Sequence, residues 1–327
     1  MQLIALPTGR RVRRLRHNAI ALGWIVLACA SFPYSSSAQN LDVSVSIRPR
    51  APVDPTVSRS PVIRADVQQV LIPTTVTDPL GRPLQGLQKQ DFRLLEDGKE
   101  LDIASFIVED QPISIGIVLD LSGSMGNKVE QARQAISQFL RLSSLGDEFF
   151  LVTFQDRPEL VRGFTKSVDD IEDDLRGIQP KGWTSLYDAI VLSIHQMKKA
   201  SRERRVLLVL SDGGDNNSRY TKSELKNLVR ESDVRIFAIS IQSHTPVLDK
   251  LADESGGHGY QVAKLDELPE AASKLSAEVH GGYVLGFHPP ERPQDGKYHA
   301  IHVELRQPKR EAGSHVGWRH GYYAPRQ

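Results

Sequence analysis

Short apolar runs and amphipathic stretches alternate along the middle of the chain, from about residue 111 to about residue 281. The apolar runs contain few polar positions, and the run at 113–119 is rich in β-branched residues, which is typical of strands covered on both faces. The clearest of these runs are 113–119, 149–154, 206–210 and 235–241. A shorter run at 160–164 and an edge strand at 259–263 are also expected.

Between these runs, apolar residues recur at the three- and four-residue spacing of a helix. Helices are expected over 168–175 and 265–279, and four more are marked by apolar positions that lie within 129–140, 186–197, 225–229 and 247–251. Strands that alternate with helices in this way predict an α/β fold: a doubly wound, mostly parallel sheet with helices on both faces.

The segments on either side of this tract have β character only. The strands expected before it are 70–78, 91–100 with an Asp97-Gly98 hairpin signal, and 103–110; those after it are 282–289, 298–306 and 318–325. Each set is too small to bury a face alone. We therefore predict that residues 65–110 and 282–327 form one β-sandwich, with an α/β domain over 111–281 inserted between its two halves.

The N-terminus has the pattern of an export signal. Five arginines lie within residues 10–16, an apolar run covers 19–32, and small residues end at Ala38. The apolar run is shorter than the ~20 residues of a membrane helix, so we predict a signal peptide over 1–38 and a Pro-rich linker over 39–64. The expected location is periplasmic, secreted or cell-surface. Membrane attachment is expected only if the signal stays uncleaved or if Cys29, the one cysteine, is lipidated.

Composition narrows the class of protein. The chain has 39% hydrophobic and 25% charged residues, which is ordinary for a globular protein, and its net charge is +1. A net charge this small gives no overall attraction to nucleic acid, so a nucleic-acid partner is not expected.

Oxygen-bearing side chains follow two of the predicted buried strands. Asp120, Ser122 and Ser124 come directly after the strand at 113–119, and Asp212 follows the strand at 206–210. Because the carboxyl ends of parallel strands meet at one edge of a sheet, both groups should lie there, and Thr184 at a helix start can reach the same place. Carboxylates and hydroxyls are hard ligands that suit Mg²⁺, with Ca²⁺ or Mn²⁺ as the alternatives.

The DxSxS motif at residues 120–124, Thr184 and the Ser211-Asp212-Gly213 sequence, in that order, resemble the metal-ion-dependent adhesion site of the von Willebrand factor type A family. The resemblance implies the α/β fold above and Asp120, Ser122, Ser124, Thr184 and Asp212 as metal residues. The order of the flanking β segments also resembles a group of exported bacterial proteins with this domain. Trp183 departs from the family, which usually has glycine before the threonine.

Two functions are compatible with such a site. The first is a metal-dependent, adhesion-type binding module, in which an open metal position takes an Asp or Glu of a protein partner. The second is a Mg²⁺-dependent hydrolase of phosphate esters. A phosphotransferase of the DxDx type would need a carboxylate where the chain has Ser122, and no GxxxxGK[ST] loop is present. We therefore predict a binding protein rather than an enzyme.

Histidines near the C-terminus raise the alternative of zinc. His299 and His302 would point to opposite faces of a strand, and no cysteine or HExxH motif accompanies them. A zinc site is not expected.

Overall fold

The structure, a computed structural model, describes residues 69–289, 295–306 and 313–325. Its central sheet has six strands in the order β10-β9-β8-β5-β6-β7, and every neighbouring pair is parallel except β6 with β7. The strands are β5 (Ile113–Asp120), β6 (Glu148–Phe154), β7 (Pro158–Thr165), β8 (Arg204–Ser211), β9 (Val234–Ile241) and β10 (Gly259–Val262). All residues of β5, β6 and β9 are buried, as expected for strands covered on both sides.

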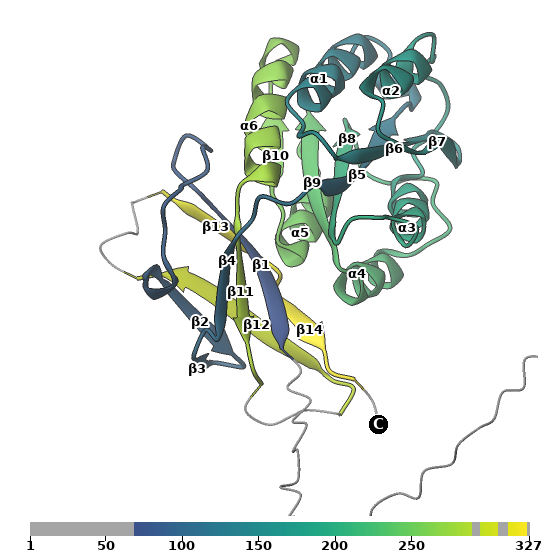
Figure 1. Ribbon diagram of the computed structural model, residues 1–327. Coiled ribbons are helices and arrows are strands. Elements are labelled where there is room, and N and C mark those ends of the chain that lie inside the picture. Colours follow the sequence, from purple (N-terminus) through teal and green to yellow (C-terminus); the bar gives the residue numbers. More distant parts are fainter. Residues whose placement is uncertain (1–68, 290–294, 307–312, 326–327) are drawn as a thin grey trace, which may run out of the picture. The chain divides into compact units, whose positions relative to one another are not determined.

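Helices cover both faces of this sheet (Figure 1). The helices are α1 (Val129–Arg141), α2 (Val168–Leu175), α3 (Leu186–Met197), α4 (Lys222–Glu231), α5 (Pro246–Ser255) and α6 (Leu268–His280). One apolar core joins α1, α2 and α6 to the sheet, and a second joins α3, α4 and α5 to it. The predicted doubly wound α/β fold is confirmed.

The sequence sets several helix ends. A capping box starts α4, where the Thr221 side chain accepts from the Glu224 backbone N–H and the Glu224 carboxylate accepts from Thr221. The prediction that the last helix begins at residue 265 was wrong. A 3₁₀ turn (Leu265–Glu267) comes first and α6 begins at Leu268, since Pro269 is favoured in the first helical turn and disfavoured further in.

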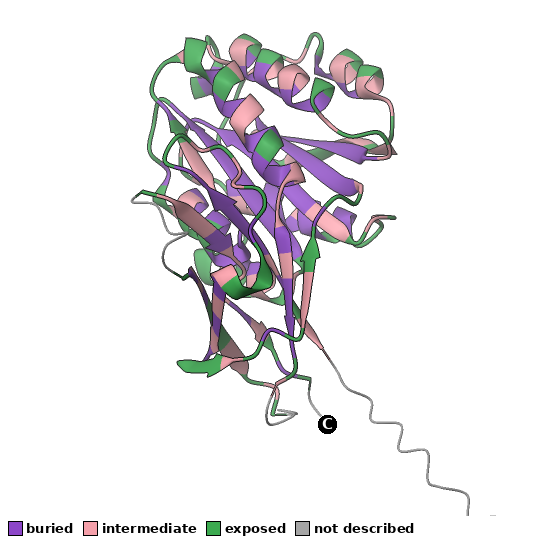
Figure 2. Cartoon of the chain, turned by 60° about the vertical axis from the view of Figure 1, so that its left-hand side comes forward, coloured by how far each residue is buried: buried purple, intermediate pink, exposed green. Residues whose placement is uncertain are grey.

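The flanking segments form two small antiparallel sheets, β13-β1-β11-β4 and β14-β12-β2-β3. Their strands are β1 (Val70–Thr77), β2 (Phe92–Glu96), β3 (Lys99–Leu101), β4 (Ser105–Val108), β11 (Tyr283–Phe287), β12 (Tyr298–Leu305), β13 (His315–Trp318) and β14 (Gly321–Tyr323). A third apolar core, with Ile72, Leu94 and Phe287 fully buried, fills the space between them. Figure 2 shows burial concentrated along the strands.

Both sheets combine strands from the two ends of the described chain. β1 pairs with β11 and β13, and β2 pairs with β12. This confirms that the flanking segments build the β structure together. The predicted hairpin at Asp97-Gly98 is also present, with both residues at positive φ, 47° and 83°.

The single strand predicted over 318–325 was wrong. The chain there belongs to two strands, because β13 pairs with β1 in one sheet and β14 pairs with β12 in the other. At the change of sheet, the His320 backbone N–H donates to Glu254 O and its carbonyl accepts from Ile301 N.

The signal peptide (1–38) and the linker (39–64) lie outside the described residues, and the predicted domain boundaries stay predictions. None of the helices in the described ranges has the length and apolar content needed to cross a bilayer.

Candidate metal centre

The candidate residues lie where the order of strands changes direction. From β5 the chain adds β6 and β7 on one side, then crosses to place β8, β9 and β10 on the other. Such a switch point opens a crevice at the carboxyl ends of the strands. Asp120 is the last residue of β5, and Asp212 directly follows β8, so the fold puts both carboxylates at this crevice.

Asp120 is fully buried and held on both oxygens. Its Oδ1 accepts from Ser122 N at 2.8 Å, and its Oδ2 accepts from Ser211 Oγ at 2.5 Å. Burial raises the pKa of Asp120 above its ordinary value; the two serines oppose the rise and the charge of Asp212 adds to it. A cation placed beside Asp120 would favour its ionised form.

A chain of hydroxyls connects the DxSxS loop to Asp212. Ser122 Oγ lies 3.2 Å from Ser124 Oγ, and Ser124 Oγ donates to Asp212 Oδ1 at 2.8 Å. These contacts bring together Asp120, Ser122, Ser124 and Asp212 from two segments that are about ninety residues apart.

Asp212 also forms an ion pair that the sequence did not reveal. Its Oδ2 lies 2.5 Å from the Nζ of Lys128, the residue that precedes α1. The Asp212 side chain is 1% exposed and that of Lys128 is 15% exposed. A positive charge therefore occupies one side of this carboxylate.

Thr184 lies in the adjoining loop and is buried. Its backbone N–H donates to Asn216 Oδ1 at 2.8 Å. Two backbone bonds join its loop to the DxSxS loop: Gly123 N donates to Gly182 O at 3.0 Å, and Lys181 N to Leu121 O at 2.8 Å. The structure thus joins the loop that carries Thr184 to the DxSxS loop through the backbone.

Gly182 explains how this loop can approach so closely. Its φ is +74°, and a Cβ at this position would come within 2.5 Å of Asp156 Oδ1. Asp156 in turn accepts from the Trp183 backbone N–H at 2.8 Å. Trp183 is held by its backbone while its side chain is 64% exposed at the rim.

Two other carboxylates in this region, Asp215 and Asp188, form hydrogen bonds with the backbone. Asp215 Oδ1 accepts from Tyr187 N at 3.2 Å, at the start of α3. Asp188 Oδ1 accepts from the backbone N–H groups of Arg219 and Tyr220. Both carboxylates accept hydrogen bonds from backbone N–H groups of a neighbouring segment.

The donor set fits a hard divalent cation. It has two carboxylates, of which the buried Asp120 favours a nearby positive charge, and three hydroxyls, all oxygen donors of the kind that Mg²⁺ prefers. The Lys128 ammonium already acts as a stand-in cation for Asp212. Asp120, Ser122, Ser124, Thr184 and Asp212 are the residues whose oxygens would hold such an ion.

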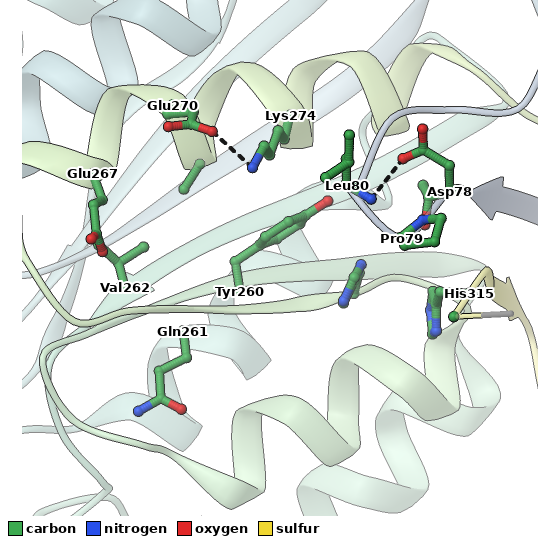
Figure 3. Close-up of a pocket in the computed structure, with 15 residues that line it drawn as sticks. Asp78, Pro79, Leu80, Tyr260, Gln261, Val262, Glu267, Glu270, Lys274 and His315 are labelled. Carbon is green, nitrogen blue, oxygen red and sulfur yellow. Dashed lines mark hydrogen bonds and ion pairs between the residues drawn. The ribbon is translucent and has the colours of Figure 1, made fainter.

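A second polar recess lies away from this rim, against β10 and α6 (Figure 3). It has a volume of about 570 Å³, and Tyr260 projects into it between Lys274 and His315. The Tyr260 hydroxyl donates to the buried Glu278 at 2.7 Å. Burial raises the pKa of Tyr260, and the neighbouring Glu278 charge adds to this rise.

Two histidines, His258 and His315, line that recess, and no sequence motif predicted this arrangement. The His258 ring stacks on that of His315 at 4.5 Å between centroids, and His258 Nδ1 lies 3.3 Å from Glu278 Oε2. Burial lowers the pKa of His315. Across the described ranges, no group of three or more His, Cys, Asp or Glu side chains is arranged to hold a metal ion.

Residues 115–214 match the family model of the von Willebrand factor type A domain. This range begins in β5 and contains all five candidate metal residues. With the doubly wound sheet around it, the match identifies a von Willebrand factor type A (VWA) domain within this part of the chain. Domains of this class typically carry a metal-ion-dependent adhesion site and bind proteins.

Several known proteins share this domain. Human inter-alpha-trypsin inhibitor heavy chain H4 is 28% identical over 164 residues, which is 45% of this chain and 18% of that relative. The chain therefore spans less than a fifth of the length of the relatives it matches.

Solved structures are also similar. A von Willebrand factor type A protein from Catenulispora acidiphila has a TM-score of 0.48 at 13% identity, covering 81% of this chain and 75% of the other. Proximal thread matrix protein 1 from the mussel byssus, described with a zinc-occupied MIDAS motif, has a TM-score of 0.48 at 18% identity, covering 57% and 50%.

Proposed function

We propose that this protein is an exported, divalent-metal-dependent binding module that ligates an Asp or Glu of a protein partner. The observation that carries the proposal is the convergence of Asp120, Ser122, Ser124 and Asp212 at the switch point of a VWA domain. Mg²⁺ is the proposed ion, with Ca²⁺ or Mn²⁺ as alternatives, because every donor is an oxygen.

The charge of the site supports an acidic ligand. Ser122, Ser124 and Thr184 are neutral donors, so they leave much of the charge of a divalent ion uncompensated. A carboxylate from a partner supplies the missing negative charge and completes the coordination. Binding of metal and partner is then mutually reinforcing, each raising the affinity for the other by the same factor.

Binding fits the arrangement better than catalysis does. The carboxylates of Asp120 and Asp212 are both engaged by hydroxyl, backbone or ammonium donors. Ser122 also stands where a phosphotransferase of the DxDx type would need a second carboxylate. Hydrolysis of a generic phosphate ester in Mg²⁺, lost in Asp120→Ala, would instead identify the protein as a hydrolase.

Affinity capture from the exterior fraction of the source cells tests the binding function. The bait is used in Mg²⁺ and in EDTA, with Ser124→Ala as the matched variant. We expect the partner to be retained only by the wild-type protein in Mg²⁺. A partner retained equally in EDTA would show that this rim is not the binding site.

Export is proposed from residues 1–38 and has its own test. Intact mass of the mature protein should correspond to a chain beginning at Gln39. A chain beginning at Cys29 with a lipid adduct would replace the signal peptide by a lipid anchor.

A further inference from the structure

Among the described residues, Lys128 is the one lysine that forms an ion pair with a candidate metal residue. Its Nζ lies 2.5 Å from Asp212 Oδ2, and its side chain is 15% exposed. The backbone is fixed independently of that contact: Lys128 N donates to Met125 O at 2.8 Å, and Lys128 O accepts from Ala132 N at 3.0 Å. The ammonium can therefore leave Asp212 by rotation of its flexible stem while the start of α1 stays in place.

We propose that the Lys128 ammonium is an internal counter-cation that a divalent metal displaces from Asp212, so that metal binding is an exchange of cations. The inference rests on the proposed metal site and concerns its regulation. Lys128 then sets how tightly the free protein holds metal.

The contacts of Asp212 favour such an exchange. Ser124 donates to its Oδ1 at 2.8 Å, and Lys128 occupies its Oδ2. Each oxygen of the carboxylate keeps a further lone pair, but an ammonium in contact with Oδ2 stands where a metal ion or its water would approach and repels that ion. The hydroxyl of Ser124 can turn and offer a lone pair to the metal, whereas an ammonium has no lone pair and repels the incoming ion.

The same contact gives Lys128 a part in the stability of the protein when no metal is bound. Asp120 is fully buried, and the side chain of Asp212 is 1% exposed. An unpaired buried carboxylate is strongly destabilising, and Lys128 provides the pairing when no metal is bound. Lys128 therefore stabilises the protein without metal. The same ion pair lowers the affinity for metal, because it has to be broken when the metal binds.

Calorimetric titration of MgCl₂ and of MnCl₂ into the full chain tests the exchange. Lys128→Met keeps the length of the side chain and removes its charge. Lys181→Met is the matched control, because Lys181 is exposed in the adjoining loop and no ion pair holds it in the described part of the chain. We expect Lys128→Met to bind metal at least about tenfold more tightly than wild type and Lys181→Met to stay within about twofold.

Thermal unfolding in EDTA supplies a second readout. Lys128→Met should melt below wild type in EDTA and gain more from saturating Mg²⁺, because only the metal then neutralises Asp212. Should Lys128→Met fail to fold without metal, Lys128→Gln retains a hydrogen-bond donor for Asp212 and is titrated in its place.

The outcomes separate this inference from the proposed function. Metal binding that is equal or weaker in Lys128→Met overturns the exchange while leaving the site intact. An equal rise in metal affinity in Lys181→Met also overturns the exchange. The removal of any positive charge near the site would then explain the tighter binding. If neither wild type nor Lys128→Met binds Mg²⁺ or Mn²⁺, the metal site itself is wrong.

Discussion

Asp147 shows how single residues of this fold keep a buried carboxylate charged. The residue is 2% exposed and accepts from the backbone N–H groups of Ile113 and Ser144, each at 2.8 Å. His280 Nε2 lies 2.9 Å from its Oδ2. Burial alone would raise the pKa of Asp147, but these hydrogen bonds outweigh burial and hold the pKa below its usual range.

The depressed pKa predicts how stability depends on pH. Stability from a carboxylate with a lowered pKa is present above the unfolded value of about 4 and is lost as pH falls through the folded value. We expect Asp147→Asn to be destabilised at pH 7 and to lose less further stability than wild type between pH 4 and pH 2. Urea unfolding at each pH measures this, with the exposed Asp110→Asn as control. If Asp147→Asn lost as much stability as wild type between pH 4 and pH 2, the lowered pKa of Asp147 would be contradicted.

Part of the site was predictable at the level of residues. Asp120 and Asp212 follow buried strands, so their common edge could be inferred from chain order alone. The Lys128–Asp212 pair joins residues 84 positions apart, and the Asn216 contact with Thr184 joins residues 32 apart. Neither pairing leaves a pattern in the sequence, because each depends on the three-dimensional path of a loop.

Among the elements, the loop at 181–184 makes the site geometry possible. Its only positive φ belongs to Gly182, and it lies against both Asp156 and the DxSxS loop. A side chain at this position would strain the backbone and push against the Asp156 carboxylate, which would displace the loop that carries Thr184.

Gly182→Ala should therefore weaken Mg²⁺ binding by about tenfold or more, as the displacement of a ligand by a strained backbone predicts. Gly213→Ala is the matched control: it lies beside Asp212, has no positive φ, and a Cβ there would meet nothing within 4 Å. Calorimetry on the two variants makes the comparison. Equal loss in both, or in neither, would mean that the conformation of Gly182 does not position the site.

Periodicity predicted the elements better than it predicted their ends. The helix at 168–175 was predicted at its observed bounds, because Ser167 caps it and its apolar spacing is clear. The strand bounds in the tail at 315–323 were not predicted correctly. The tail holds a four-residue and a three-residue strand that belong to different sheets. Strands that short carry too few alternating positions to show where one sheet is left for the other.

For the whole molecule, the pairing of chain ends decides how the β-sandwich holds together. β1 has two neighbours, β11 and β13, and both come from the C-terminal segment. Tyr283 contributes further by donating its hydroxyl to Leu84 O at 2.8 Å and accepting from Leu87 N at 3.2 Å. The N-terminal strands therefore depend on residues about two hundred positions away.

Deletion of residues 282–327 should expose the N-terminal strands to protease while the α/β tract stays resistant. The reason is that β1 loses every strand partner and β2 keeps only the three-residue β3. Limited proteolysis with mass spectrometry measures this, with the full chain as control. Protection of residues 70–108 in the truncated protein would show that these strands do not need the C-terminal segment.

The contacts between the sandwich and the α/β domain include a buried ion pair. Arg204 at the start of β8 reaches Glu109 Oε2 at 2.8 Å, and Arg235 shares the same oxygen at 3.4 Å. The domain carrying the candidate site is thus tied to the strands that flank it.

Titration of Mg²⁺ into wild type and Ser124→Ala by calorimetry tests the central claim most directly. Ser124 is exposed and lies outside the apolar cores, so its replacement should change the free energy of unfolding by less than ~2 kcal/mol. The account predicts one Mg²⁺ site per wild-type chain, and at least about tenfold weaker binding in a Ser124→Ala protein that remains folded. The same Mg²⁺ affinity in both proteins would contradict it.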